Sequence, residues 1–339
     1  MSAKAAKQSP PDSGAAAIRP SALAWRMAES LPLPERRKLA LRLIENDAEE
    51  IVFRRGGATW TGFPWDRMIT GNLFAYGSFQ RTETRAVLGW MRRHRRLGPN
   101  RAIVDVGANI GTSAIPFARE TPCRVIAIEP VPELHAMLCR NILGNGLAGR
   151  IEPVKVAISN AKARRVRMVL PFENAGAAEV VRPGRRPSFA GMLAERSRVS
   201  VPATGLDTLL KRRRVAAKNV AFVWADVQGS ESHVIASAPR LWAAGVPLFC
   251  EVCPPLWGNA GDPRAFLREA ARHFTGFIPS EVLIAKNRPA VRPIAELAAF
   301  CRGLTQLGTD VLFLNEGNQR WCPESETLSH RGNRRYRPG

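Results

Sequence analysis

Four acidic residues stand where apolar runs of the sequence end. They are Asp105, Glu129, Asp226 and Glu251. Continuous apolar runs are typical of parallel strands buried on both faces, and the carboxyl ends of such strands meet at one edge of the sheet. Ligands of open α/β sheets bind in the crevice beside that edge. The sequence therefore predicts a ligand site where carboxylates can accept hydrogen bonds and take up protons.

A glycine-rich corner follows the first of these runs. Residues 105–111 read Asp-Val-Gly-Ala-Asn-Ile-Gly, and the three residues behind them can open a helix. Gly107 and Gly111 lack a Cβ, so the backbone can turn tightly and approach a ligand. The pattern is not the dehydrogenase G-x-G-x-x-G, and a pyrophosphate beside Asp105 would meet a like charge. An acid here suits the protonated amine and the sulfonium of S-adenosylmethionine.

Glu129 supplies a second ligand signal. It ends the apolar run 125–128, about 20 residues beyond the glycine corner, which is the spacing of a carboxylate that binds ribose hydroxyls. Pro130 stops the strand, and residues 131–143 carry a helical pattern. The corner and Glu129 together predict S-adenosylmethionine as the cofactor.

In their order along the chain, these segments resemble the FkbM-type family of S-adenosylmethionine-dependent methyltransferases. The resemblance spans about residues 70–315 and rests on 105–111, 128–130, 141–145, 156–159, 204–207, 226–231, 250–252 and 310–314. It implies a Rossmann-like α/β fold with a mostly parallel, seven-stranded twisted sheet and one antiparallel edge strand. It also implies that the cofactor is bound by Asp105, Gly107, Ala108, Asn109, Gly111, Glu129, Pro130 and Ala157.

The methyl acceptor is suggested by the resemblance alone. It implies methylation of an oxygen, on a hydroxyl of a sugar, a glycan or a secondary metabolite. Trp224-Ala225 precede Asp226 where the family usually carries a lysine or a similar residue, and Gly205 interrupts the threonine-leucine-aspartate element. These departures leave the predicted cofactor site intact and concern the acceptor pocket.

A protonated hydroxyl is a poor nucleophile, so a positioned base would accelerate the transfer, typically by about 10²–10⁴-fold. Asp226 is the first candidate and Glu251 the second, because both end strands at the crevice. Glu231 could orient a substrate or a metal, and Gln228 could hydrogen-bond the acceptor. Each acid could instead bond loop amides or surface arginines, and His233 is expected on a helix face. Converging acids could hold Mg²⁺, but their spacing does not require it, so we predict no metal site.

The net charge of +21 favours either an anionic partner or a solvated basic surface. Eight of the 50 basic residues are lysines, so arginine accounts for the other 42, spread over many segments. No aromatic residues interleave with them as in nucleic-acid recognition motifs. Compositional bias and solvated surface are the favoured explanation, and an anionic partner stays open.

Cysteine usage favours a reducing cytoplasm. Six cysteines are too few for a disulfide scaffold, and most have apolar neighbours. Cys250 and Cys253 form one C-x-x-C without a second pair, so buried thiols are favoured over a zinc site. No segment has the length and hydropathy of a membrane span, and residues 1–20 lack the apolar region of a secretory signal.

The chain divides into four predicted parts. These are a flexible leader (1–34), an N-terminal helical extension (35–98), a methyltransferase domain (99–315) and a basic tail (316–339). The extension should open with an amphipathic helix that carries Leu39, Leu43 and Ile44 on one face. The predicted strands of the domain are 102–104, 125–128, 151–158, 220–225, 246–252, 277–285 and 310–314, with short strands at 166–170 and 198–202 in a long connection. We expect that connection to shape the acceptor site, and a passive surface hairpin stays open as the alternative.

Three other functions stay open at this point. An RNA methyltransferase would suit the charge, although 226–228 (Asp-Val-Gln) lacks the proline-rich motif expected for base N-methylation. An NAD-dependent oxidoreductase would use the same fold with a different cofactor. An adaptor that kept the fold without catalysis would bind no cofactor.

Overall fold

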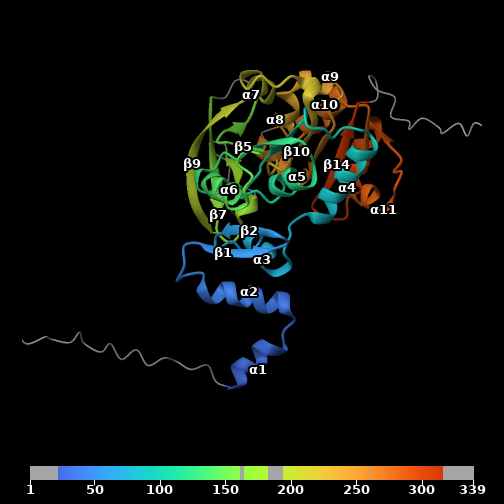
Figure 1. Ribbon diagram of the computed structural model, residues 1–339. Coiled ribbons are helices and arrows are strands. Elements are labelled where there is room, and N and C mark those ends of the chain that lie inside the picture. Colours follow the sequence, from blue (N-terminus) through green and yellow to red (C-terminus); the bar gives the residue numbers. More distant parts are fainter. Residues whose placement is uncertain (1–21, 161–163, 182–193, 261, 316–339) are drawn as a thin grey trace, which may run out of the picture.

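The apolar runs of the sequence form a mostly parallel central sheet (Figure 1). The computed structural model describes residues 22–160, 164–181, 194–260 and 262–315, and within them this sheet has eight strands. In sheet order they are β13 (Arg292–Pro293), β12 (Gly276–Pro279), β14 (Thr309–Leu314), β11 (Leu248–Val252), β10 (Val220–Ala225), β3 (Ala102–Val106), β4 (Arg124–Ile128) and β5 (Ile151–Val154). The five strands from β11 to β5 run parallel, and β14 lies antiparallel to both of its neighbours.

The predicted fold class is confirmed. The sheet is mainly parallel, and its reversed strand β14 lies two strands in from the edge, because β12 pairs with its outer side and β13 pairs with β12. The two-residue β13 adds an eighth strand. Strand order reverses between β3 and β10, and such a switch point is where open α/β sheets bind ligands. Asp105 and Asp226 flank this point.

Helices cover both faces of the sheet, as the burial of its strands on both faces requires. One face carries α4 (Arg81–Arg93), α5 (Ala114–Glu120), α6 (Pro132–Gly144) and α11 (Ser280–Ala285). The other carries α7 (Leu206–Arg212), α8 (Glu231–Ala236), α9 (Pro239–Ala243), α10 (Ala265–His273) and α12 (Leu297–Arg302). Each face has its own apolar core, so the sheet is the middle layer of three. The 3₁₀ turns η2 (Ala217–Asn219), η3 (Pro254–Ala260) and η4 (Ile294–Glu296) join these elements.

The long connection after β5 forms a second, smaller sheet. Its strands, in the order β6-β9-β7-β8, are β6 (Ala157–Ile158), β9 (Glu195–Thr204), β7 (Arg165–Pro171) and β8 (Glu179–Val181), with the 3₁₀ turn η1 (Ala175–Ala177) before β8. The two predicted short strands are therefore confirmed. The single strand predicted over 151–158 is wrong: the Val156 amide donates to the Val154 carbonyl (3.2 Å), and this turn redirects the chain to pair with β9.

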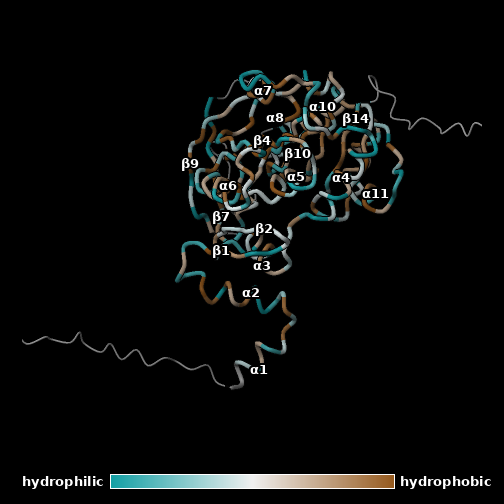
Figure 2. Tube along the Cα trace, in the orientation of Figure 1, coloured by the Kyte–Doolittle hydropathy of each residue, from teal (hydrophilic) through white to brown (hydrophobic). Residues whose placement is uncertain are grey.

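The N-terminal extension contains a hairpin as well as helices. Its elements are α1 (Ala22–Ser30), α2 (Leu33–Ile44), β1 (Ile51–Arg55), β2 (Ala58–Gly62) and α3 (Ile69–Tyr76). Helix α1 occupies part of the expected leader, whose residues 1–21 lie outside the described ranges. Hydrophobic and hydrophilic residues mix along α2 (Figure 2), but the face predicted for it is wrong. Leu41 is its buried residue, whereas Leu43 is 71% exposed, because α2 packs only one side against α3.

Side-chain amides of α6 and of its C-cap residue fasten the hairpin to the central domain. Asn141 accepts from the Thr61 amide (2.6 Å) and donates to the Thr61 carbonyl (3.0 Å). Asn145 makes the same pair of bonds with Thr59 (3.0 and 2.7 Å). The two asparagines thus satisfy the outer edge of β2 as a neighbouring strand would, which fixes the extension on the domain.

The strand predicted over 277–285 is also corrected. Strand β12 ends at Pro279, and helix α11 begins at Ser280. A proline cannot donate to a sheet ladder, and its fixed φ of −59° suits the residue before a helix. The closing strand predicted at 310–314 is confirmed as β14.

Candidate active site

The glycine corner packs against the end of β10. Gly107 has φ +88°, and a Cβ on it would lie 1.9 Å from the Asp226 carbonyl oxygen. The amides of Gly107 and Ala108 both donate to the Ile128 carbonyl (2.9 and 3.0 Å). Glycine is therefore required at 107 because the corner touches the backbone of β10, a constraint that the sequence argument had assigned to the approach of a ligand.

Asp105 lies beneath this corner and is completely buried. Its Oδ2 accepts a hydrogen bond from the Ser113 hydroxyl (2.6 Å), which ties the start of α5 to the end of β3. Its Oδ1 is buried and has no hydrogen-bond partner within the described residues. Burial raises the pKa of Asp105 to about 7. The Asp105 carboxyl group thus titrates near neutral pH, and its Oδ1 can still accept a hydrogen bond.

Glu129 joins the two loops that follow β3 and β4. Its two carboxylate oxygens accept from the Asn109 amide (3.0 Å) and the Val131 amide (2.8 Å). Burial raises the pKa of Glu129 to about 7, while these two amides favour the ionised form. Each oxygen still has lone-pair capacity for a ligand hydroxyl.

Ala175 holds the small sheet over this corner through both of its backbone groups. Its amide donates to Asp66 of the extension (3.1 Å), and its carbonyl accepts from the Asn109 side chain (2.9 Å). Asn109 itself has φ +49°, a conformation that asparagine tolerates better than most residues. Three parts of the chain therefore meet at η1.

An open pocket lies between the corner and the small sheet, with about 520 Å³ of empty space when the solvent at its mouth is included. Of the residues predicted to bind the cofactor, Gly107, Asn109, Glu129, Pro130 and Ala157 line it. Asp105, Ala108 and Gly111 lie behind the lining. The opposite wall contains apolar residues that the sequence did not single out, namely Met168, Ala175, Ala178 and Val180. They belong to the insertion, so only its tertiary fold brings them to the pocket.

The same pocket reaches one of the predicted catalytic acids, Asp226, and Gln228, whereas Glu231 and Glu251 are not among its lining residues. Gln228 donates through Nε2 to Asp226 (2.6 Å) and, at 3.3 Å, to Glu251. The structure therefore brings these three predicted residues together. Burial, followed by the negative charges of Asp226, Glu231 and Asp310, raises the pKa of Glu251 to about 9. Burial also raises the pKa of Asp226, against the hydrogen bonds that its carboxylate accepts.

Glu231 turns inward and serves the loop. Its Oε1 accepts from the amides of Val227 (3.1 Å) and Gly229 (3.4 Å), and it is buried. Burial raises its pKa to about 7. This arrangement matches the alternative in which an acid bonds loop amides, so Glu231 shapes the turn that carries Gln228.

Two further residues at this site escaped the sequence analysis as functional candidates. Gln80, which precedes α4, hydrogen-bonds to the Asp226 side chain. Asp310 lies opposite Glu251 in the antiparallel register of β11 and β14, and burial with the charges of Asp226 and Glu83 raises its pKa to about 7. The register of a predicted closing strand could have indicated Asp310, whereas no local signal indicated Gln80.

The model of the methyltransferase FkbM domain matches residues 105–274. The chain belongs to the FkbM methyltransferase family. Gln80 and Asp310 lie outside the matched range, although they adjoin Asp226 and Glu251. We call the region around these four residues the cleft.

Three solved structures illustrate what the chain is similar to. P. horikoshii TYW2 in complex with MeSAdo has 13% identity and a TM-score of 0.37, covering 78% of this chain and 70% of that one. The O-methyltransferase from Bacillus cereus in complex with SAH has 13% identity and a TM-score of 0.36, covering 73% and 86%. A geranyl diphosphate methyltransferase with SAM has 11% identity and a TM-score of 0.36, covering 73% and 94%. No curated protein matches the sequence significantly.

Other features of this FkbM methyltransferase bear on the remaining predictions. Within the described residues, no group of three or more His, Cys, Asp or Glu side chains is arranged to hold a metal ion. Cys250 and Cys253 are free thiols whose pKa values are raised, mainly through burial. Cys123, Cys139 and Cys301 also form no disulfide, and Cys322 lies outside the described ranges. No helix in the described part of the chain could span a membrane.

A second pocket, of about 570 Å³, separates the extension from α5. Trp60 and Leu73 of the extension line one side, and Ile115 of α5 lines the other. Phe79 and Arg81, the neighbours of Gln80, also line it. The segment that carries Gln80 therefore lies between this pocket and the cleft of Asp226.

Proposed function

We propose that this protein transfers a methyl group from S-adenosylmethionine to a hydroxyl of a sugar, a glycan or a secondary metabolite. The observation that carries the proposal is the single pocket with Glu129 at one end and Asp226 with Gln228 at the other. One cavity thus joins a carboxylate suited to ribose hydroxyls with a carboxylate suited to an acceptor proton.

The residues of the corner fit this cofactor. Glu129 would accept hydrogen bonds from ribose hydroxyls, and the apolar wall around Met168 and Val180 would cover a flat ring. Asp105 lies behind the lining, with its Oδ1 lacking a partner among the described residues, and its carboxylate would favour the cationic end of the ligand through charge rather than contact. When bound, the cofactor supplies a methyl group on an activated sulfonium.

Asp226 is the proposed general base. Its carboxylate would take the proton of the acceptor hydroxyl while the oxygen forms its new bond to the methyl carbon and the carbon–sulfur bond breaks, which leaves a neutral thioether. Solvent would then receive the proton from Asp226. Gln228 would orient both the acid and the acceptor, and Glu251, with a pKa of about 9, stays protonated at neutral pH. Orientation of the reactants can supply about 7–11 kcal/mol of the barrier, so positioning is the larger share of the task.

The charge of the cleft supports a neutral acceptor. No lysine or arginine in the described ranges forms an ion pair with Asp226, Glu231, Glu251 or Asp310. A phosphate or carboxylate next to the reacting hydroxyl would meet the proposed carboxylate of Asp226 with no basic side chain paired to it. This argues against RNA as the acceptor, and the basic surface, if it binds an anion, does so away from the cleft.

The free thiols support the expected cytoplasmic setting.

Two measurements test the proposal. Calorimetric titration with S-adenosylmethionine and with NADH should give binding of the former alone. E129A should weaken this binding, while D262A, an exposed change just before α10, should not. Binding of NADH alone would contradict the proposal and favour an oxidoreductase. Binding of neither S-adenosylmethionine nor NADH would favour an adaptor.

The acceptor requires a screen with methyl-labelled S-adenosylmethionine against separated glycans, lipids, RNA and small metabolites. Label is expected in a neutral hydroxylated fraction with the wild type and not with D226N. Label confined to RNA, with transfer that falls steeply as salt rises, would replace this acceptor with nucleic acid.

A further inference from the structure

Two glutamines converge on Asp226, and both have left-handed backbones. Gln80 has φ +47° and Gln228 has φ +50°. Positive φ is uncommon for residues other than glycine, asparagine and aspartate, and it costs free energy that the surroundings must supply. Such residues cluster at functional sites. Here both side chains hydrogen-bond the same carboxylate, that of Asp226, although the two glutamines are far apart in the sequence.

Gln80 occupies the N-cap of α4 without capping that helix. Its carbonyl accepts from the Thr84 hydroxyl (2.8 Å) and amide (3.0 Å), as an N-cap carbonyl should, but its side chain makes no capping bond. Serine, threonine, aspartate and asparagine are preferred at this position because their side chains cap the first turn. The sequence instead places a longer amide here, and that amide bonds to Asp226.

The segment around Gln80 is fixed from the side of the extension. Phe79 and Arg81 line the second pocket together with Leu73 and Gly77. Gly77 ends α3 with φ +80°, and a Cβ there would lie 3.2 Å from the Gly56 amide of the hairpin. The contact between the hairpin and the end of α3 therefore fixes the position of the backbone that leads to Gln80. Asn141 and Asn145 in turn fix the position of the hairpin on the domain.

We propose that Gln80 is a positioning residue that holds Asp226 ionised and aimed at the acceptor, so that the N-terminal extension is part of the active site. The catalytic meaning rests on the proposed methyl transfer, whereas the contact itself does not. The residue lies outside the matched FkbM domain (105–274), so the cleft is completed by a segment that this domain does not contain.

Asp226 needs such donors because acids face it from every side. Glu251 of β11, Asp310 of β14, Glu231 of α8, Asp105 of β3 and, beyond Asp310, Glu83 of α4 contribute the neighbouring charges. Amide donors favour the charged form of a carboxylate. The side-chain amides of Gln80 and Gln228 therefore favour the charged form of Asp226 against the effect of its burial.

The decisive variant is Q80G. Glycine adopts φ +47° without strain, so the melting temperature should equal or exceed that of the wild type while the donor to Asp226 is lost. We expect kcat to fall about 10- to 100-fold with the KM for S-adenosylmethionine unchanged. The acidic limb of the pH–rate profile should move to higher pH, because removal of a donor raises the pKa of Asp226. T82A, an exposed change in the same turn, should alter none of these.

A second readout does not depend on turnover. In protein labelled with ¹³C at aspartate Cγ, the resonance lost in D226N reports the titration of Asp226, and Q80G should move its midpoint to higher pH. An unchanged midpoint, unchanged kcat, or a loss of kcat that merely follows a lower melting temperature would overturn the proposal. If the wild type transfers no methyl group, the proposed function fails, and the resonance still decides whether Gln80 sets the state of Asp226.

Discussion

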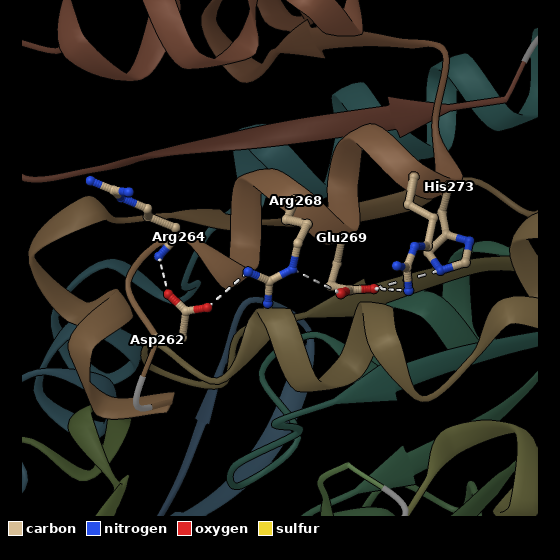
Figure 3. A network of polar contacts seen from close by, with 6 residues as sticks. Asp262, Arg264, Arg268, Glu269 and His273 are labelled. Carbon is tan, nitrogen blue, oxygen red and sulfur yellow. Dashed lines mark hydrogen bonds and ion pairs between the residues drawn. The ribbon is translucent and has the colours of Figure 1, made fainter.

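Two groups of acids in this molecule have opposite surroundings. Along α10, Asp262 accepts from the Arg264 amide (2.9 Å) and the Arg268 guanidinium (2.8 Å), and Glu269 lies within 4 Å of two arginines and His273 (Figure 3). In the cleft, the carboxyl groups of Asp226, Glu251 and Asp310 face one another and two glutamines. The bond to Arg268 lowers the pKa of Asp262, whereas burial raises the pKa of Glu251 to about 9.

The difference matters because arginine is abundant in this chain. With 42 arginines available, ion pairs form readily on the surface, and arginine supplies the cation in most of those described. The cleft acids lack such partners and have neutral amides instead. Partly buried acids with raised pKa values and no counter-ion lower stability, so their presence together beside a pocket indicates function.

The largest effect should come from D226N, which keeps the shape of the side chain and removes the proposed base. We expect kcat to fall about 10²–10⁴-fold while S-adenosylmethionine still binds, because the side chain acts on the acceptor. Rate and calorimetry measured on the same preparation check this. D262N is the matched control from α10 and should keep the wild-type rate. Full activity in D226N would move the base to Glu251.

The next effect concerns the other end of the pocket. E129Q keeps an acceptor oxygen for one loop amide but loses the charge that two amides share. Hydrogen bonds to charged groups contribute about 1.5–3 kcal/mol, so affinity for S-adenosylmethionine should fall about 10- to 100-fold. Calorimetry measures this directly. An unchanged affinity, in a variant with an unchanged melting temperature, would remove Glu129 from the cofactor site.

The two ends of this pocket differ in how many of their residues could be predicted from the sequence. Glu129 and Asp226 could be predicted because each ends an apolar run, and run, acid and loop are contiguous in the chain. Asp310 meets Glu251 only through strand register, and Gln80 meets Asp226 only through the fold of the extension. Asp105 was predicted to touch the cofactor, but the structure places it behind the pocket lining. A local sequence pattern does not specify how deeply a side chain is buried relative to a pocket.

A smaller effect separates the two acid groups by pH. Because the pKa of Glu251 is raised to about 9, the folded protein keeps a proton that the unfolded chain loses above about pH 4.5. Stability therefore declines as pH rises from that value towards 9. E251Q removes this decline and should melt about 2–4 °C higher than the wild type at pH 8.5, with little difference at pH 5. An equal difference at both values would mean that Glu251 is ionised in the folded protein.

The smallest effect is expected on α10, where the sign is reversed. The pKa of Asp262 is lowered by Arg268, so its contribution to stability is present above its unfolded pKa and is lost as pH falls through the lower value. Both groups are exposed to solvent, which screens their attraction. R268A should therefore change the melting temperature little at pH 7, and less still in high salt. A large loss that persists in salt would show that the α10 network supports the fold more than exposed ion pairs do, and would weaken the contrast with the cleft.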